Sequence, residues 1–334
     1  MRPIDVIGVP SSVGMRNNGA REGPDAFEEY GIEGRLQEHV GPGTKVTYRN
    51  MRKRWEYDMG KEYVDAILDP KEAPTPPVYY RKEVEAVCAR GAVEVFRSLR
   101  VGNLPLVIGG DHSISIGTNG EFVRFAIRQR LRPGLLWLDA HLDAHTDRTS
   151  RSHNANGEPL AALLGYGVLA RKIKECVPLK RTPWEKTKKP RRLWLKPSQV
   201  FHVGAGEDDC EEEEKDFFAR HKIMHFDMPM LMKKDGWDKL RADLSNWLEG
   251  IDTLAVSVDL DVFHAHWAPG VSYPRLSDGL LRNEGLSLAE LVRKSGKLGH
   301  LELMEHNPLN EESDPAREPR TAEFGTELAC AMFK

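Results

Sequence analysis

The sequence predicts one domain, residues 1–334, with a three-layer α/β/α fold around a mostly parallel, doubly wound sheet. Short apolar runs alternate along the chain with longer segments in which apolar residues recur every three or four positions. Three of these runs end abruptly in Asp or His, as sites at the carboxyl edge of an open α/β sheet do. With 334 residues, of which 40% are hydrophobic, the chain can bury a single large core.

The elements follow in order along the chain. We expect strands at residues 3–9, 104–108, 134–138, 200–204, 223–226, 254–258 and 301–304. We expect helices starting near residue 23 and spanning 84–99, 120–130, 237–248, 286–297 and 321–333. Two surface excursions interrupt this pattern. The first, near 50–78, is polar and proline-spotted, with one short helix; the second, near 172–197, is basic and is read as a solvated excursion, a lid or a subunit contact.

Composition excludes several classes of function. A formal net charge of -3 provides no basic face for nucleic acid. The sequence has no apolar stretch long enough to cross a bilayer and opens in a strand pattern instead of a signal peptide. The four cysteines are far apart, so we expect neither a disulfide frame nor a thiolate metal site, and a reducing, cytoplasmic location.

The run Leu136-Trp137-Leu138 leads directly into polar ligands. Asp139, His141 and Asp143 alternate in the sequence, and on an extended backbone all three side chains would point the same way. Two carboxylates and an imidazole on one buried face would repel or stay unsatisfied unless a cation joins them. We therefore expect a divalent metal at this strand end.

Two further runs add ligands. Residues 104–108 break at Gly109-Gly110-Asp111-His112-Ser113, where paired glycines would let the backbone turn and present His112. Residues 254–258 lead into Asp259-Leu260-Asp261. Each motif alone has an ordinary alternative as a loop, turn or helix cap. Together they supply four Asp and two His ligands without a thiolate, which is more than one zinc takes and suits two Mn²⁺-like ions bridged by carboxylates.

These blocks, with Leu303-Met304-Glu305-His306-Asn307-Pro308 and Gly19-Ala20-Arg21-Glu22-Gly23-Pro24, resemble the signature blocks of the ureohydrolase superfamily, and of the arginases in particular. The resemblance covers nearly the whole chain. It implies an arginase-like fold, two Mn²⁺ ions (Co²⁺ or Ni²⁺ being possible substitutes), release of urea from a guanidino substrate, and a homo-oligomer, either a trimer or a hexamer.

The resemblance also implies roles for the ligands. The metal ligands would be His112, Asp139, His141, Asp143, Asp259 and Asp261, with Asp139 and Asp259 bridging the ions. Two catalytic residues follow. Asp143 would also hydrogen-bond the metal-activated hydroxide and pass its proton to the departing amine, while Glu305 would pair with the substrate guanidinium.

The implied substrate contacts are His145, Ser152, Asn154, Asn156, Asp209 and Glu212. Ser152 and Asn154 match positions that hold the amino-acid carboxylate, whereas Asp209 and Glu212 match positions for the α-amino group or form an exposed acidic helix start. Three departures stand out. His145 replaces a usual asparagine, Tyr273 a usual small residue, and Asn156 a histidine credited with proton transfer. An amide cannot shuttle protons, so that role is absent or has moved to His145 or His153.

Three readings of function stay open. The first is hydrolysis of arginine. Within the same class, the substrate could be N-hydroxyarginine, agmatine, guanidinobutyrate or formiminoglutamate. In another class, the chain would be a catalytically weak arginine-binding sensor, which only Asn156 favours and the complete ligand set disfavours.

Overall fold

The computed structural model describes the chain except for residues 16–17, 71–75, 77, 171–193, 312–319 and 334. In the described residues, the sheet has eight strands in the order β2-β1-β3-β8-β7-β4-β5-β6, and all of its pairings are parallel. The strands are β1 (Ile4–Gly8), β2 (Val46–Asn50), β3 (Leu104–Ile108), β4 (Pro133–Leu138), β5 (Val200–Val203), β6 (Met224–Phe226), β7 (Thr253–Asp259) and β8 (Leu298–Met304). The predicted α/β fold class is confirmed.

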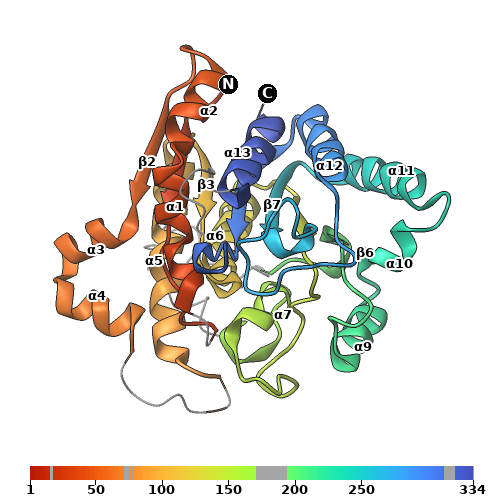
Figure 1. Ribbon diagram of the computed structural model, residues 1–334, viewed down its shortest axis with the longest axis horizontal. Helices are drawn as coiled ribbons and strands as arrows, with labels where there is room; N and C mark the ends of the chain where they lie inside the picture. Colours follow the sequence, from red (N-terminus) through yellow and green to blue (C-terminus); the bar gives the residue numbers. More distant parts are fainter. Residues whose placement is uncertain (16–17, 71–75, 77, 171–193, 312–319, 334) are drawn as a thin grey trace.

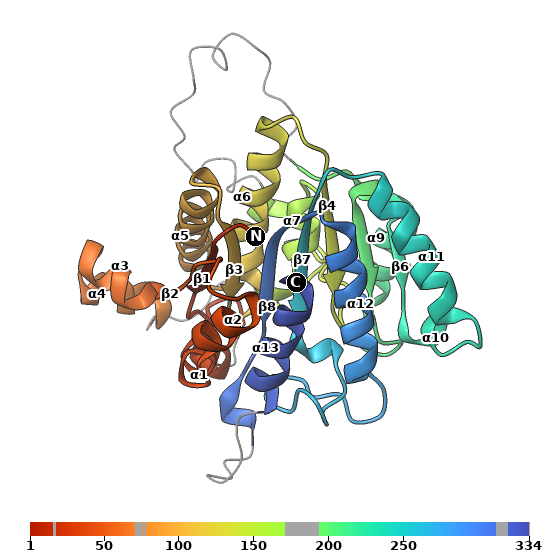
Figure 2. The same cartoon turned by 90° about the horizontal axis from the view of Figure 1, so that it is seen from above.

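Helices cover both faces of this sheet (Figures 1 and 2). One face packs against α1 (Gly23–Glu29), α2 (Ile32–Val40), α10 (Met228–Leu231), α11 (Gly236–Glu249), α12 (Arg282–Ser295) and α13 (Arg320–Phe333). The opposite face packs against α5 (Arg81–Arg100), α6 (Ser115–Arg128), α7 (Pro159–Leu163) and α9 (Glu212–His221), and the apolar cluster on this side extends to α3 (Met51–Met59) and α4 (Lys61–Leu68). The sheet therefore lies between two layers of helices, which gives the three-layer α/β/α fold.

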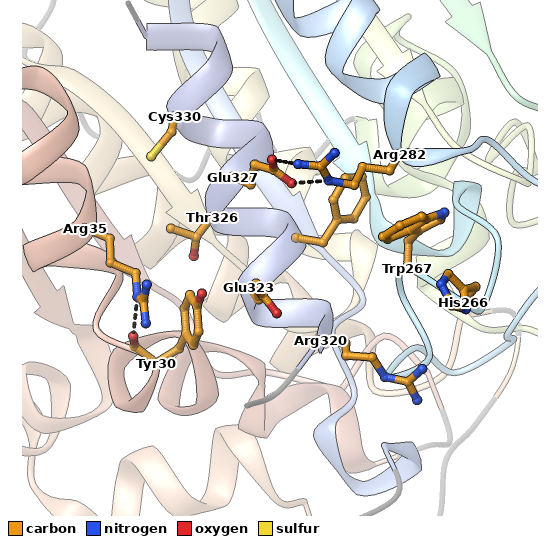
Figure 3. A pocket seen from close by; sticks show the side chains of 11 residues that line it. Tyr30, Arg35, His266, Trp267, Arg282, Arg320, Glu323, Thr326, Glu327 and Cys330 are labelled. Carbon is orange, nitrogen blue, oxygen red and sulfur yellow. Dashed lines mark hydrogen bonds and ion pairs between the residues drawn. The ribbon is translucent and has the colours of Figure 1, made fainter. Parts of the chain in front are cut away.

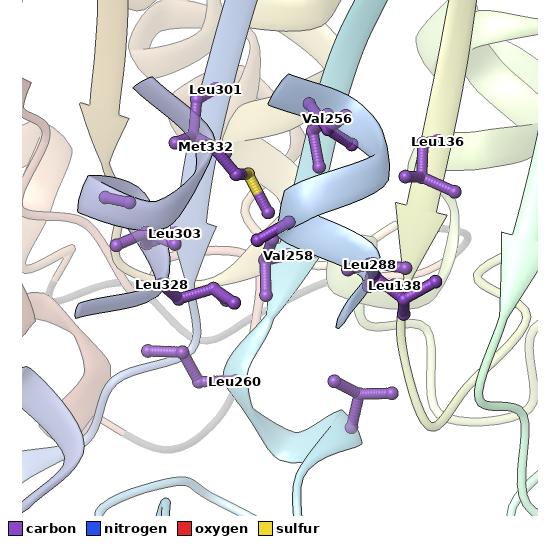
Figure 4. Close-up of a cluster of buried hydrophobic side chains, with 14 of the residues drawn as sticks. Leu136, Leu138, Val256, Val258, Leu260, Leu288, Leu301, Leu303, Leu328 and Met332 are labelled. Carbon is purple, nitrogen blue, oxygen red and sulfur yellow. The ribbon is translucent and has the colours of Figure 1, made fainter. Parts of the chain in front are cut away.

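The core consists of two apolar clusters, one on each side of the sheet. Along β4, Leu136 and Leu138 belong to the cluster shown in Figure 4, whereas Leu135 and Trp137 belong to the opposite one. This alternation is the two-residue period of a strand. Because both faces are covered, the strands read as continuous apolar runs in the sequence.

The first edge of the sheet differs from the prediction. β2 was not foreseen, because only Val46 of its residues is fully buried, and it pairs with β1 through Ile4 and Val46. The expectation of one short helix near 50–78 was wrong: α3 and α4 follow each other there, and both stand out beyond the β2 edge (Figures 1 and 2). Asn50 starts α3 by accepting a hydrogen bond from Arg52 N at 3.0 Å. Residues 172–193 of the second excursion lie outside the described residues.

The centre of the sheet positions the site. Strands β3, β8, β7 and β4 are adjacent in that order and parallel, so their carboxyl ends open at one edge. The helix after β3 begins earlier than predicted, because Asp111 accepts a hydrogen bond from Ser113 N at 3.0 Å and caps a 3-10 turn that runs directly into α6. Among the described helices, none is both long and apolar enough to cross a membrane.

Candidate metal centre

The candidate ligands come together at the carboxyl ends of β3, β4 and β7. Two groups of side chains have ligand atoms within 4.8 Å of one another. The first consists of His112, Asp139 and Asp143, and the second of Asp139, His141 and Asp261. Asp139 belongs to both groups, as a carboxylate bridging two ions would.

The ring of His112 faces the sixth candidate ligand as well. Its Nδ1 atom lies 3.1 Å from Oδ2 of Asp139, 3.2 Å from Oδ2 of Asp143 and 3.1 Å from Oδ2 of Asp259. One imidazole nitrogen therefore points at three carboxylate oxygens from two other strand ends.

The second group is built around His141. Its Nδ1 atom lies 3.2 Å from Oδ2 of Asp261 and 3.5 Å from Oδ1 of Asp139. The two oxygens of Asp139 thus face different histidines. All six side chains that were predicted as metal ligands lie together.

The local backbone differs from the extended one that we expected. β4 ends at Leu138, Asp139 accepts a hydrogen bond from His141 N at 2.7 Å, and Asp143 has a positive φ of 49°. The expectation of strand alternation was therefore wrong, because a tight loop, not a strand, brings the three side chains together.

Asp259 shows that the two readings of an Asp-x-Asp motif are compatible. Its Oδ1 atom accepts a hydrogen bond from Asp261 N at 2.9 Å and caps the 3-10 helix Leu260–Val262. Its Oδ2 atom faces His112. One carboxylate is both a helix cap and a candidate ligand.

Glycine is required before His112 for close packing, not for the turn that we expected. Neither Gly109 nor Gly110 has a positive φ. A Cβ atom on Gly110 would lie 1.7 Å from the carbonyl oxygen of Ser11, which is backbone and cannot move aside cheaply. The loop after β1 and the loop that carries His112 are thereby held together.

The electrostatics of the cluster favour a bound cation. Burial and the neighbouring carboxylate of Asp139 raise the pKa of Asp143 well above the usual range of a carboxyl group. Burial and the neighbouring carboxylate of Asp261 do the same to the pKa of Asp259. Burial also opposes ionisation of Asp139, but hydrogen bonds from His112 and His141 lower the pKa of its carboxyl overall. Four buried Asp carboxylates against two imidazoles leave excess negative charge, and hard oxygen donors with imidazole nitrogens suit Mn²⁺-like ions.

Glu305 lies beside this cluster at the end of β8. Its Oε1 atom accepts a hydrogen bond from His112 N at 2.8 Å, while its Oε2 atom is buried and has no hydrogen-bond partner among the residues that the structure describes. Burial and then the charge of Asp111 raise the pKa of the Glu305 carboxyl. Like Asp143, Glu305 has a positive φ, of 63°. One carboxylate oxygen is free for a cationic ligand that would satisfy it.

Two side chains that sequence reasoning missed hold the ligands in place. The indole of Trp137 donates to Oδ2 of Asp139 at 2.8 Å and stacks on the His112 ring, with centroids 4.2 Å apart. His202 lies 2.8 Å from the carbonyl oxygen of His141 and donates to it through Nε2. Burial lowers the pKa of His202 to about 4, so the ring is neutral. A histidine in the middle of an apolar strand was the available signal.

The predicted substrate loop after Asp143 is only partly buried. His145 is buried, with Nε2 at 3.4 Å from Oε2 of Glu214, a carboxylate that sequence reasoning missed. Ser152 is exposed and accepts a hydrogen bond from Asn154 N at 3.3 Å. The backbone N–H of Asn156 donates to the carbonyl of Gly14 at 3.0 Å, which ties this loop to the loop after β1.

The predicted acidic contacts lie on or just before the start of α9, which also meets the substrate loop: Arg151 of the loop donates to Oε1 of Glu213 at 2.8 Å. Oδ2 of Asp209 is held by the buried guanidinium of Arg275 at 2.5 Å, a partner not foreseen. Glu212 is exposed at the start of α9. Tyr273 is also largely exposed, and its ring meets His141 edge-on with centroids 6.0 Å apart.

A separate cavity of about 500 Å³ lies beside α13 and is shown in Figure 3. Its walls include Tyr30, Trp267 and Phe324, and Arg282 Nε donates to Glu327 Oε2 at 2.7 Å across its rim. None of its lining residues is a candidate metal ligand, so this cavity is distinct from the site at the strand ends.

The parallel sheet, with paired histidine–carboxylate groups at its carboxyl edge, defines an α/β protein with a candidate site for two metal ions. A protein-family model described as "Arginase family" matches residues 2–334 of the chain. The chain belongs to the arginase family.

The individual relatives match all or nearly all of the chain. The chain is 28% identical to the arginase of Bacillus caldovelox over 336 residues, which is 100% of this chain and 98% of the relative. It is 27% identical to the arginase of Staphylococcus aureus strain MSSA476, over 97% of this chain and 96% of the relative. The solved structure of the Bacillus caldovelox arginase is 26% identical, with a TM-score of 0.79 over 100% of this chain and 98% of that one. The formimidoylglutamase of Bacillus subtilis, 17% identical, shares the fold with a TM-score of 0.66, over 99% and 86% of the two chains.

Proposed function

We propose that the protein is a binuclear manganese hydrolase that cleaves the guanidino group of arginine, or of a close analogue, and releases urea. The observation that carries the proposal is the shared Asp139 between two histidine–carboxylate groups, with the free Oε2 atom of Glu305 beside them. A guanidino carbon is a poor electrophile, so its hydrolysis at neutral pH needs both an activated water and a fixed cation site.

His112 and Asp143 would hold one ion, His141 and Asp261 the other, and Asp139 and Asp259 would bridge them. Two ions of this kind supply one thing, a lower pKa for a shared water, so that hydroxide is present at neutral pH. Mn²⁺ is proposed because oxygen donors outnumber nitrogen donors and no thiolate takes part. Co²⁺ and Ni²⁺ are alternatives that a metal-exchange assay would rank.

The protein's own carboxylates perform the remaining steps. Glu305 pairs with the guanidinium through its free oxygen and fixes the carbon to be attacked. Asp143, whose buried Oδ2 atom faces Nδ1 of His112 and has no hydrogen bond within the described residues, takes a proton from the attacking water and delivers it to the departing amine nitrogen. The carbon–nitrogen bond to the side chain breaks, and urea and a primary amine are the products.

The test is a panel assay of the Mn²⁺-loaded protein. Arginine, N-hydroxyarginine, agmatine, guanidinobutyrate and formiminoglutamate are offered separately, and urea, hydroxyurea or formamide is measured. If urea is released fastest from arginine, the proposal is supported. If one of the analogues is hydrolysed faster, that analogue is the substrate and the proposed type of reaction still holds. If every substrate fails while arginine binds tightly, the protein is the arginine sensor instead.

We also propose a cytoplasmic homo-oligomer, either a trimer or a hexamer, with no nucleic-acid or membrane partner. The described cysteines Cys88, Cys210 and Cys330 are free thiols, which suits a reducing compartment. Light scattering of the purified protein measures the oligomeric state directly.

A further inference from the structure

A buried carboxylate lies behind the metal centre on β8, at Glu302. It is fully buried and accepts hydrogen bonds from five side chains, Ser115, Thr118, Asn119, Ser257 and His300. Neither the ligand set nor the proposed proton transfers use it. A charged side chain in a strand that is buried on both faces needs a reason, because unpaired burial is costly.

We propose that Glu302 is a positioning residue, which acts through Ser257 to fix the ring of His112 so that Nδ1 faces the metal centre. Ser257 joins the two: its Oγ atom lies 3.0 Å from Nε2 of His112 and 3.0 Å from Oε2 of Glu302. This inference rests on the proposed metal centre and is independent of which guanidino substrate is used.

The directions of these hydrogen bonds follow from the proton inventory. A carboxylate only accepts, so the single proton of Ser257 goes to Glu302. The Ser257 oxygen must then accept from His112, which places the ring proton on Nε2. When an ion replaces the proton that Nδ1 shares with Asp139, the lone pair of Nδ1 faces the ion held among Asp139, Asp143 and Asp259.

The other donors keep Glu302 from accepting elsewhere or turning away. Ser115 Oγ and Asn119 Nδ2 each donate to Oε2 at 2.6 Å, and His300 Nε2 lies 2.8 Å from Oε1. Both α6 and β8 therefore hold the carboxylate in one orientation. If Ser257 could instead donate to His112, the ring would carry its proton on Nδ1 and lose the lone pair that binds metal.

The experiment compares two variants that each delete one hydroxyl donating to Glu302. Ser257→Ala breaks the connection to His112, whereas Thr118→Val deletes a donor that does not touch His112. The readout is Mn²⁺ affinity of the metal-free protein, measured by competition with a fluorescent chelator. We expect Ser257→Ala to weaken Mn²⁺ binding roughly tenfold to a hundredfold, and Thr118→Val to stay within about threefold of the wild type.

A third variant and a folding control complete the test. Glu302→Gln replaces an acceptor oxygen by an amide donor, so its Mn²⁺ affinity should fall with that of Ser257→Ala. Thermal unfolding in excess chelator should give similar midpoints for Ser257→Ala and Thr118→Val. Equal loss of Mn²⁺ affinity in those two variants, or no loss in Ser257→Ala, overturns the proposal. Wild-type protein that binds two Mn²⁺ but hydrolyses no guanidino compound refutes the proposed function alone.

Discussion

The metal end and the substrate end of the site are built in different ways. Asp139 and Glu305 follow central strands and are almost fully buried, with 0% and 3% of their surface exposed. Ser152 and Asp209 lie on loops, and the side chain of Asp209 is 42% exposed. Residues fixed by the sheet can be placed from a strand pattern, whereas loop residues can be exchanged without disturbing the core. Under the proposed roles, we expect substitutions in the loops to change specificity without disturbing the metal ligands.

The largest expected effect is at the metal end. Asp259→Ala removes a carboxylate that both faces His112 and caps a helix turn, so urea release should fall on the order of a thousandfold or more. Steady-state kinetics with added Mn²⁺ measures this. Asp252→Ala, on an exposed carboxylate paired with Arg132 just before the same strand, is the control and should leave the rate unchanged. Normal turnover in Asp259→Ala would show that the ligand assignment is wrong.

A smaller effect is expected where the two ends meet. Glu305→Gln keeps the shape of the side chain but removes the charge that would pair with the guanidinium. KM should rise roughly tenfold to a hundredfold, the worth of a charged hydrogen bond, with a smaller change in kcat. A large fall in kcat at unchanged KM would instead place Glu305 in the chemical step.

At the substrate end, Asn156→His should increase the rate. An imidazole can exchange a proton at neutral pH and an amide cannot, so kcat should rise by roughly tenfold or more if the substrate is arginine. The pH profile of kcat should gain a group titrating near neutrality. A lower rate in this variant would indicate that the loop is shaped for a different substrate.

The smallest effect on activity is expected at Glu158, a buried carboxylate at the end of the partly buried substrate loop. Burial, and then the charge of Asp147, raises the pKa of Glu158 to about 8 from its usual 4.5. The folded state keeps this proton where the unfolded state releases it, so the contribution to stability is full below pH 4.5 and is lost as pH rises to about 8.

The corresponding variant is Glu158→Gln, which does not titrate. Its thermal midpoint should decline less between pH 5 and pH 8 than that of the wild type, in calorimetry at matched ionic strength. Glu249→Gln, at an exposed position, is the control and should follow the wild type. Parallel curves for Glu158→Gln and the wild type would contradict the assignment.

The sequence predicted the central strands, and the Asp and His side chains that cluster at their ends, because the apolar run and the polar residues after it coincide. A run such as Leu104–Ile108 is buried on both faces, and the first polar side chain beyond it must lie at the edge of the sheet. The expectation that an extended backbone brings Asp139, His141 and Asp143 together was wrong, because Asp143 has a positive φ. Periodicity in a sequence does not reveal a left-handed backbone conformation.

Other features could not be read because they depend on distant partners. β2 is polar apart from Val46, and its pairing with β1 leaves no period-two pattern. The ion pair of Asp209 with Arg275 joins residues far apart in the sequence, and neither loop predicts the other. The sequence shows Glu302 only as a charged residue inside an apolar strand. It does not show the five side chains that donate hydrogen bonds to its carboxylate.

The positive φ angles of Asp143 and Glu305 set a limit on how far this scaffold can be made heat-resistant. A non-glycine residue held in that region gives up about 1–3 kcal/mol of folding free energy. A laboratory selection for thermal tolerance alone would thus favour glycine or asparagine at the two positions, and would remove the two acids that we propose take part in the reaction. Stabilising substitutions that keep the proposed activity therefore have to be sought at other positions.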